Sequence, residues 1–203
     1  MFKSKKAVLL INCFYKEEDG FGNLCNELQL CKNIDVFNFY LFKNNKIIDS
    51  ITTLVDTILD KKYKEIYLIG HNIGSSIVLF LANKYSEITK IIISNSIINE
   101  KKLNFDITKQ QEKEINNINH ECQNNLDKIT CPILIIHTIN NEITNVDNSI
   151  YIHSKVSSKI NYLITINDVS NSIYTTNRYE EVYNHIIDFI TLVHEENIIH
   201  LNI

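Results

Sequence analysis

The chain has 203 residues and a formal net charge of -4, and hydrophobic residues make up 44% of it against 22% charged residues. This length fits a single domain, and the apolar fraction excludes a chain that is disordered throughout. The mild acidic excess argues against a general nucleic-acid-binding protein, which would carry a basic face, and no apolar run is long enough to predict a transmembrane segment.

Six segments of strand length are separated by longer segments. Most of the six are continuous apolar runs, which are typical of strands buried on both faces of a parallel sheet. The first follows a basic start to the chain, but its apolar stretch is short and no small-residue cleavage site follows, so we interpret it as a strand and not as a signal peptide. The predicted strands are residues 7–11, 35–41, 66–69, 91–93, 133–136 and 160–166.

Apolar residues recur at intervals of three and four between these runs. This spacing predicts amphipathic helices over residues 47–59, 77–82 and 182–193. Alternating strands and helices predict an α/β fold with helices on both faces of a mostly parallel sheet and right-handed crossovers.

A polar stretch at about 99–128 interrupts the alternation. It is rich in Lys, Glu, Gln and Asn and has few apolar positions. Two interpretations stay open: a short helical, cap-like insert over one edge of the sheet, or a solvated connector. We expect no second domain, so residues 1–203 are predicted to form one.

The cysteines give little support to disulfides or metal sites. They are odd in number and include no Cys-x-x-Cys pair, and His120 and Cys122 have no further ligands at zinc-site spacing. We therefore expect reduced thiols in a cytoplasmic protein that holds no metal and no cofactor. The five cysteines are Cys13, Cys25, Cys31, Cys122 and Cys131.

The most informative motif is Gly70-His71-Asn72-Ile73-Gly74, which lies between a predicted strand and a predicted helix. In a sharp strand-to-helix turn the central residue is held in strained geometry, and small neighbours let the turn close. Asn72 is thereby placed where open α/β sheets usually position ligands and nucleophiles.

This segment resembles the nucleophile elbow of the α/β-hydrolase superfamily, in particular of small esterases and monoacylglycerol-lipase-like hydrolases, whose motif reads Gly-His-Ser-X-Gly-Gly. Residues 9–14 stand where the family has an apolar strand ending in His-Gly-Phe. Residues 131–142 stand where it has proline, a strand, His-Gly, two residues and aspartate. Residues 166–172 precede the last helix, where the family places its catalytic histidine. The resemblance implies a minimal α/β-hydrolase fold with about six mostly parallel strands.

All three positions that correspond to the family's catalytic triad hold asparagine: Asn72 for the nucleophile, Asn141 for the acid and Asn171 for the base. A carboxamide is a poor nucleophile, carries no charge and is not basic near neutral pH, so it replaces none of these groups. Glu142 is a rival for the acid. Residues 154–184 contain no histidine, so this range offers no rival for the base.

The oxyanion hole that the resemblance implies is altered too. Its expected donors are the backbone amides of Phe14 and Ile73, but Asn12 and Cys13 replace the family's His-Gly. Cys13 is an alternative nucleophile without an evident base. We expect His71 to be structural and to point away from the site, with a role as substitute base as the alternative.

These substitutions favour a hydrolase-like protein that has lost its triad, a pseudoenzyme with a binding or interaction role. Two alternatives stay open. One is an active carboxylesterase or lipase-type hydrolase that uses unidentified residues, and the other is a binder of a small-molecule or acyl-chain ligand. The expected partners are a small apolar or acyl ligand or another protein, and no nucleic acid.

Overall fold

The computed structural model describes residues 5–13, 20–43, 46–99, 107–168 and 172–192. Six parallel strands form one sheet in the order β2-β1-β3-β4-β5-β6. The α/β architecture predicted from the alternation is therefore confirmed. The strands are β1 (Lys6–Asn12), β2 (Ile34–Tyr40), β3 (Glu65–His71), β4 (Ile88–Ser94), β5 (Ile133–Thr138) and β6 (Asn161–Ile166).

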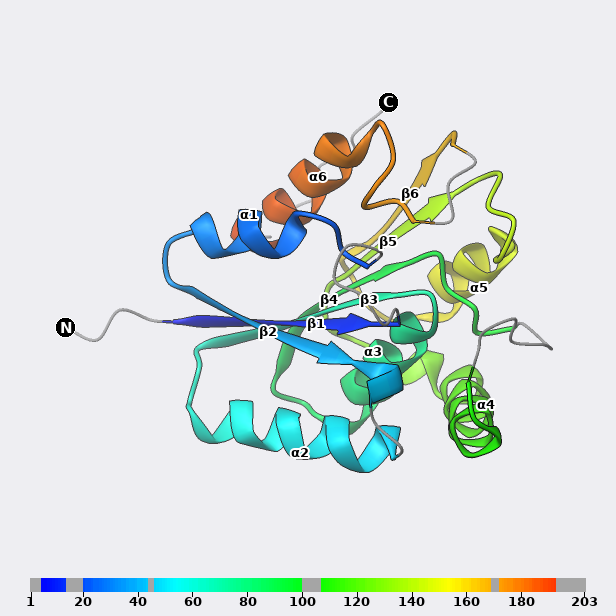
Figure 1. Cartoon of the computed structure of the whole chain (residues 1–203), viewed down its shortest axis with the longest axis horizontal. Coiled ribbons are helices and arrows are strands. Elements are labelled where there is room, and N and C mark those ends of the chain that lie inside the picture. The colour runs from blue at the N-terminus through cyan, green and yellow to red at the C-terminus, as the bar shows by residue number, and fades with distance from the viewer. Residues whose placement is uncertain (1–4, 14–19, 44–45, 100–106, 169–171, 193–203) are drawn as a thin grey trace.

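Helices cover both faces of the sheet, with α1 and α6 on one face and α2, α3 and α4 on the other (Figure 1). Short 3-10 turns follow β2 and α4. The α-helices are α1 (Leu24–Leu30), α2 (Ile47–Asp60), α3 (Ile73–Lys84), α4 (Lys109–Gln123), α5 (Asp147–Lys155) and α6 (Tyr179–Thr191).

Strand β1 shows why the apolar runs are continuous. Ala7, Leu9 and Ile11 face the core beneath α2 and α3, whereas Val8 and Leu10 face the core beneath α1 and α6. All five side chains are fully buried. A strand covered by helices on both faces needs apolar residues at every position, so the periodicity of a half-exposed strand does not appear.

Helix α4 lies within the expected insert at about 99–128. Its apolar positions Ile115, Ile118 and Cys122 are buried, and the Cys122 thiol donates a hydrogen bond to the backbone carbonyl of Ser76 in α3, at 3.4 Å. This helix thus joins the layer formed by α2 and α3, rather than lying over an edge of the sheet.

Two glycines allow α3 to begin directly against the sheet. A Cβ atom added at Gly74 would lie 2.2 Å from the backbone oxygen of Ile11, and one added at Gly70 would lie 2.3 Å from the backbone oxygen of Gly74. Both distances are far inside van der Waals contact, and both neighbours are backbone atoms. The strand-to-helix turn after β3 therefore requires hydrogen in place of a side chain at these positions.

We predict that Gly74→Val destabilises the fold by at least about 1–3 kcal/mol, because the new side chain must displace the end of β1. Ala82→Val, in the less buried last turn of the same helix, is the matched control and costs about 0.5 kcal/mol from helix propensity alone. Urea denaturation monitored by circular dichroism measures both. Equal midpoints for the two variants would contradict the close approach of α3 to β1.

Candidate functional site

The turn between β3 and α3 holds Asn72 in a backbone conformation that side-chain-bearing residues rarely adopt, with φ 50° and ψ -116°. Its amide donates to the carbonyl of Ser94 at 2.9 Å, and its carbonyl accepts from the amide of Ser75 at 3.0 Å. The Ser75 hydroxyl donates to the carbonyls of Gly70 and Ser94, at 3.1 and 2.9 Å. These bonds tie the turn to the ends of β3 and β4 and keep the strained residue in place.

The side chain of Asn72 lies against His71. Asn72 Nδ2 is 3.1 Å from His71 Nε2, and His71 Nδ1 is 2.9 Å from the hydroxyl oxygen of Ser94. Because an amide nitrogen only donates, Nε2 is the acceptor, and the hydrogen-bond network assigns the proton to Nδ1. His71 is buried, and its Nε2 faces Asn72, contrary to the expectation that it points away from the elbow.

Tyr174 completes this buried chain of polar groups from the far side. Its hydroxyl is 2.9 Å from the Ser94 hydroxyl, and its ring stands edge-on to the His71 ring and to Phe21, with centroids 5.4 and 4.8 Å apart. Burial raises the pKa of Tyr174 well above its usual value, so the phenol stays protonated. The chain Asn72–His71–Ser94–Tyr174 thus connects the elbow to the segment between β6 and α6.

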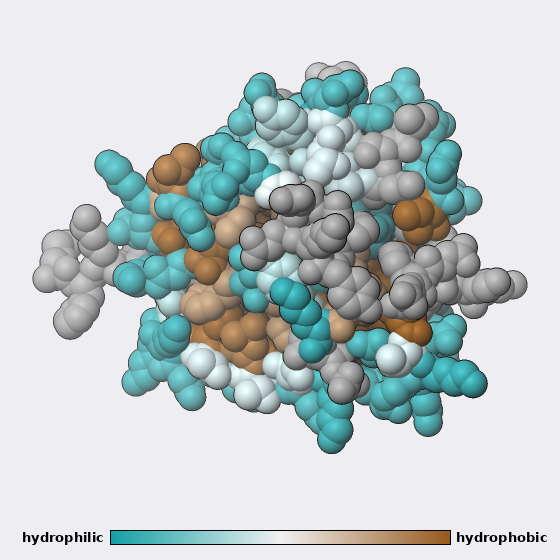
Figure 2. Space-filling view, viewed as in Figure 1, coloured by the Kyte–Doolittle hydropathy of each residue, from teal (hydrophilic) through white to brown (hydrophobic). Residues whose placement is uncertain are grey.

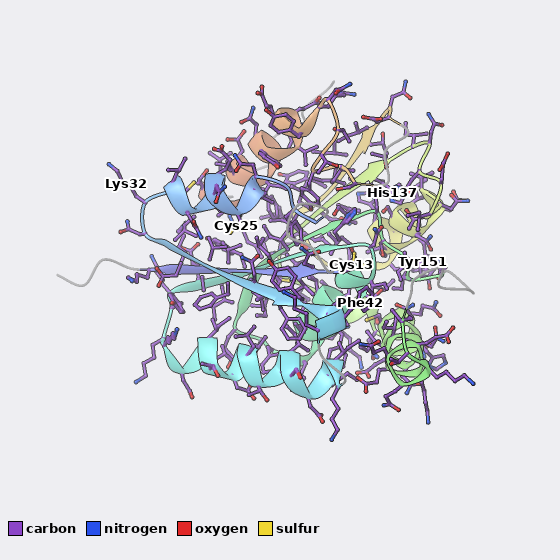
Figure 3. All side chains as sticks on the ribbon, viewed as in Figure 1. Cys13, Cys25, Lys32, Phe42, His137 and Tyr151 are labelled. Atoms are coloured by element: carbon purple, nitrogen blue, oxygen red, sulfur yellow. The ribbon has the colours of Figure 1, made fainter. Side chains whose placement is uncertain are left out.

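Cys13, directly after β1, occupies the space beside the elbow (Figure 3). Burial raises the pKa of its thiol to about 12, although hydrogen bonds from the Asn72 side chain, from its own backbone amide and from the Ile73 amide lower it. Only 1% of the Cys13 surface is exposed. The thiol therefore stays protonated at neutral pH, and it lies close to the Ile73 amide, an expected oxyanion donor.

Asn72 also carries an unsatisfied polar atom. Its side-chain oxygen Oδ1 is buried and has no hydrogen-bond partner among the described residues, and the whole residue is 0% exposed. A buried, unpaired carbonyl oxygen costs on the order of 1–3 kcal/mol. The centre of the site is thus buried and uncharged, and one of its hydrogen-bond acceptors has no donor.

Asn141, the expected acid position, caps its own turn after β5. Its Oδ1 accepts hydrogen bonds from the amides of Ile143 and Thr144, at 2.9 and 2.8 Å, and its Nδ2 donates to Thr138 Oγ1 at 3.1 Å. An asparagine in this role stabilises a turn. Glu142, the rival acid, is exposed next to it.

The turn that holds Asn141 is fixed to the sheet by a buried histidine. His137 Nδ1 is 2.7 Å from the Ser149 hydroxyl, and its Nε2 is 3.3 Å from both the backbone carbonyl and the hydroxyl of Thr144. At the neighbouring position, the amide of Thr138 donates to Asn95 Oδ1 at 2.9 Å. Polar contacts thus join the end of β5 to the residue after β4, to the turn that holds Asn141 and to α5.

Two expected site residues, Phe14 and Asn171, lie outside the described residues. Ser94 and Tyr174, which the structure brings to the elbow, were not singled out from the sequence. A signal existed for each of them. Ser94 directly follows the apolar run 91–93, at the same sheet edge as Asn72, and Tyr174 is the one aromatic residue in the polar segment 167–178.

Neither a cluster of metal-binding side chains nor a long apolar helix is found in the described part of the chain. Within those residues, no group of three His, Cys, Asp or Glu side chains could hold a metal ion. The same residues include no helix with the length and apolar character to cross a membrane. Cys122, once considered with His120, is instead buried and bonded to Ser76.

Comparison with solved structures places the architecture among lipolytic enzymes and esterases. One of two metagenome-derived lipolytic enzymes, LipS and LipT, superposes with a TM-score of 0.76 at 13% identity, covering 92% of this chain and 94% of its own. The monoacylglycerol lipase of Paleococcus ferrophilus gives 0.75 at 13% identity, with 91% and 93% covered. Est1E from Butyrivibrio proteoclasticus gives 0.73 at 17% identity, with 93% and 88% covered.

Comparison of the sequence alone identifies no relatives. No protein-family model matches it, and a search of curated proteins finds no significantly similar sequence. At identities of 13–17%, the structural likeness shows a shared fold, and any activity has to be argued from the residues of the site.

We predict that Tyr174→Phe lowers the free energy of unfolding by about 1 kcal/mol, because it removes the bond to Ser94. Combined with Ser94→Ala, the two losses are not additive, since both variants break the same contact. Tyr179→Phe, on the exposed side of α6, is the control and changes stability by less than about 0.5 kcal/mol. Chemical denaturation of these four variants and of the unsubstituted protein checks this, and strict additivity would contradict the contact.

Cys13 predicts a pH dependence of stability. The unfolded chain releases the thiol proton near its ordinary pKa of 9.0, whereas the folded chain retains it until about 12. The stabilisation is therefore complete below pH 9 and is lost as the pH rises towards 12. We expect the unfolding free energy of Cys13→Ala to fall less steeply over this interval than that of the unsubstituted protein. Urea denaturation at several pH values measures the two slopes, and parallel curves would refute the assignment.

Proposed function

We propose that this chain, which has the α/β-hydrolase fold, is a pseudoenzyme: a non-catalytic member of that architecture with a binding or interaction role. The observation that carries the proposal is the side chain at the tip of the elbow. Asn72 is fully buried, and its side-chain nitrogen Nδ2 lies 3.1 Å from His71 Nε2. A carboxamide in that position does not attack an ester carbonyl, because its nitrogen lone pair is delocalised and no hydroxyl or thiolate is available.

The surrounding groups support the same conclusion. His71 has both ring nitrogens bonded to neighbours, so no lone pair is directed at a nucleophile. The thiol of Cys13 is held protonated by burial, and it lies close to the Ile73 amide that a developing oxyanion would need. The nucleophile is thus replaced by an asparagine, the candidate base has hydrogen-bond partners at both ring nitrogens, and the oxyanion donor lies against a protonated thiol.

A second candidate function is an active hydrolase that acts through other residues. One contact favours it: the Ser94 hydroxyl lies 2.9 Å from His71 Nδ1, which is the distance of a nucleophile–base pair, and transfer of the ring proton from Nδ1 to Nε2 would let Nδ1 act as the base. Several solved structures with this architecture are lipolytic enzymes or esterases. Ser94 is nevertheless fully buried and shares its hydroxyl with Tyr174 and the carbonyl of Gly70, so we rank this function second.

For the binding role, the fold leaves two kinds of partner, a small apolar or acyl ligand and another protein. Native mass spectrometry of the purified protein distinguishes these two possibilities, because a retained lipid adds a discrete mass to the chain. The five cysteines are free thiols, and on this ground we also propose a reducing, cytoplasmic location.

We predict that the purified protein neither hydrolyses a short-chain ester above background nor reacts with a fluorophosphonate probe. Asn72→Ser alone stays silent as well, because a serine without a general base is a poor nucleophile. The triple variant Asn72→Ser, Asn141→Asp and Asn171→His is equally silent or weakly active. Cys13 still occupies the oxyanion position in that variant, and the loss of one donor there costs roughly 10²–10³ in rate.

The ordering of these variants is the test. Adding Cys13→Gly to the triple variant frees the Ile73 amide and should raise any activity, whereas Cys25→Gly on α1 serves as the matched control and should not. Turnover by the unsubstituted protein that disappears in Ser94→Ala, with the fold retained, would refute the pseudoenzyme and establish Ser94 as the nucleophile.

A further inference from the structure

Strand β6 forms one lateral edge of the sheet, and among the described residues no strand pairs with its outer side. Its sequence, Asn-Tyr-Leu-Ile-Thr-Ile over residues 161–166, contains no charge and no proline. The amide of Ile133 bonds the carbonyl of Ile160, and the amide of Ile139 bonds that of Ile166. The even-numbered residues of β6 therefore bond β5, and the odd ones direct their backbone groups away from the sheet at Leu163 and Thr165.

The opposite edge, β2, is shielded by charged side chains. Lys61 Nζ lies 4.9 Å from the centre of the Phe37 ring, and Lys43 Nζ lies 4.2 Å from that of Tyr40. Asp35, in the same strand, pairs with Lys5 at 3.2 Å. Figure 2 shows apolar side chains over β2 and α2 bordered by hydrophilic ones. Charged residues at an edge are the usual protection against edge-to-edge association, and β6 lacks them.

We infer that β6 pairs antiparallel with β6 of a second copy of this chain, about a twofold axis near the middle of the strand. Such pairing satisfies the outward backbone groups of both strands and joins two six-stranded sheets into one. A twofold contact is closed, so it removes the exposed edge without leading to open-ended assembly. Within the strand, Tyr162 is 38% exposed, which adds apolar surface at this edge.

The charges at the two ends of β6 fit a second copy in this orientation. Lys159 lies just before the strand, and Asp168 lies just after it. In an antiparallel pair, the beginning of one strand meets the end of the other, so each Lys159 comes close to the partner's Asp168. The same two residues would be far apart in a parallel pair, in which Lys159 meets Lys159. The charge pattern therefore selects a twofold, antiparallel partner.

This surface is separate from the elbow. The elbow lies at the carboxyl ends of the strands, whereas the pairing runs along the side of β6. The two proposals thus stand or fall independently, and a dimer is compatible with an active or an inactive site.

Sedimentation velocity and light scattering on the full chain test the inference. The expected mass is twice the 23.7 kDa of one chain. Thr165→Lys places a charge on the exposed edge, and Thr165→Pro removes an outward amide without loss of a bond to β5. Both should weaken dimerisation at least about tenfold while circular dichroism and thermal melting stay unchanged. Asn38→Pro, at an exposed position of β2, is the matched control and should leave the mass unchanged.

A charge exchange identifies the partner's orientation. Lys159→Glu and Asp168→Lys should each weaken the dimer, and the double variant should restore it, because the exchanged charges again lie opposite one another. A monomer at every concentration, open-ended aggregates, or a dimer that survives both Thr165 variants would overturn the inference. A dimer that the double charge variant fails to restore would refute the antiparallel orientation.

Discussion

The close approach of α3 to the end of β1 is the constraint on which the rest of the structure depends. Two backbone atoms meet at Gly74 and Ile11 where no side chain fits, and this contact sets the angle at which the chain leaves β3. The angle in turn forces Asn72 to a positive φ. With ψ at -116°, Asn72 lies outside the left-handed helical region in which asparagine is favoured, so the turn stays strained and is held in place by its hydrogen bonds.

Polar groups that meet at the elbow hold the molecule together. Asn72, His71, Ser94 and Tyr174 come from β3, β4 and the segment before α6, and their hydrogen bonds join elements on both sides of the central strands. A buried network of this kind requires nearly every member to be satisfied, which favours neutral groups with fixed partners. Catalysis requires the opposite, a lone pair or a thiolate that is free to react, and this difference is the physical ground for the proposed loss of activity.

The sequence was sufficient for the strands and for the position of the elbow, since continuous apolar runs and two spaced glycines are local signals. Helices α1 and α5 followed only from the alternation, because each buries too few apolar residues to show a helical period. The contact between Ser94 and Tyr174 joins residues 80 positions apart and has no periodic signature. The orientation of His71 was likewise invisible, because it depends on a hydroxyl group supplied by the neighbouring strand.

The strand order also determines when each part of the sheet is made. Strand β1 is synthesised first but lies inside the sheet. Both of its neighbours, β2 and β3, are therefore synthesised after it. Each further strand is then added on one side, in the order of synthesis, and β6 comes last. A nascent chain thus displays its uncharged edge strand for the shortest time, after the remaining sheet is available to receive it. Translation itself thereby limits the exposure of the segment that is most prone to associate.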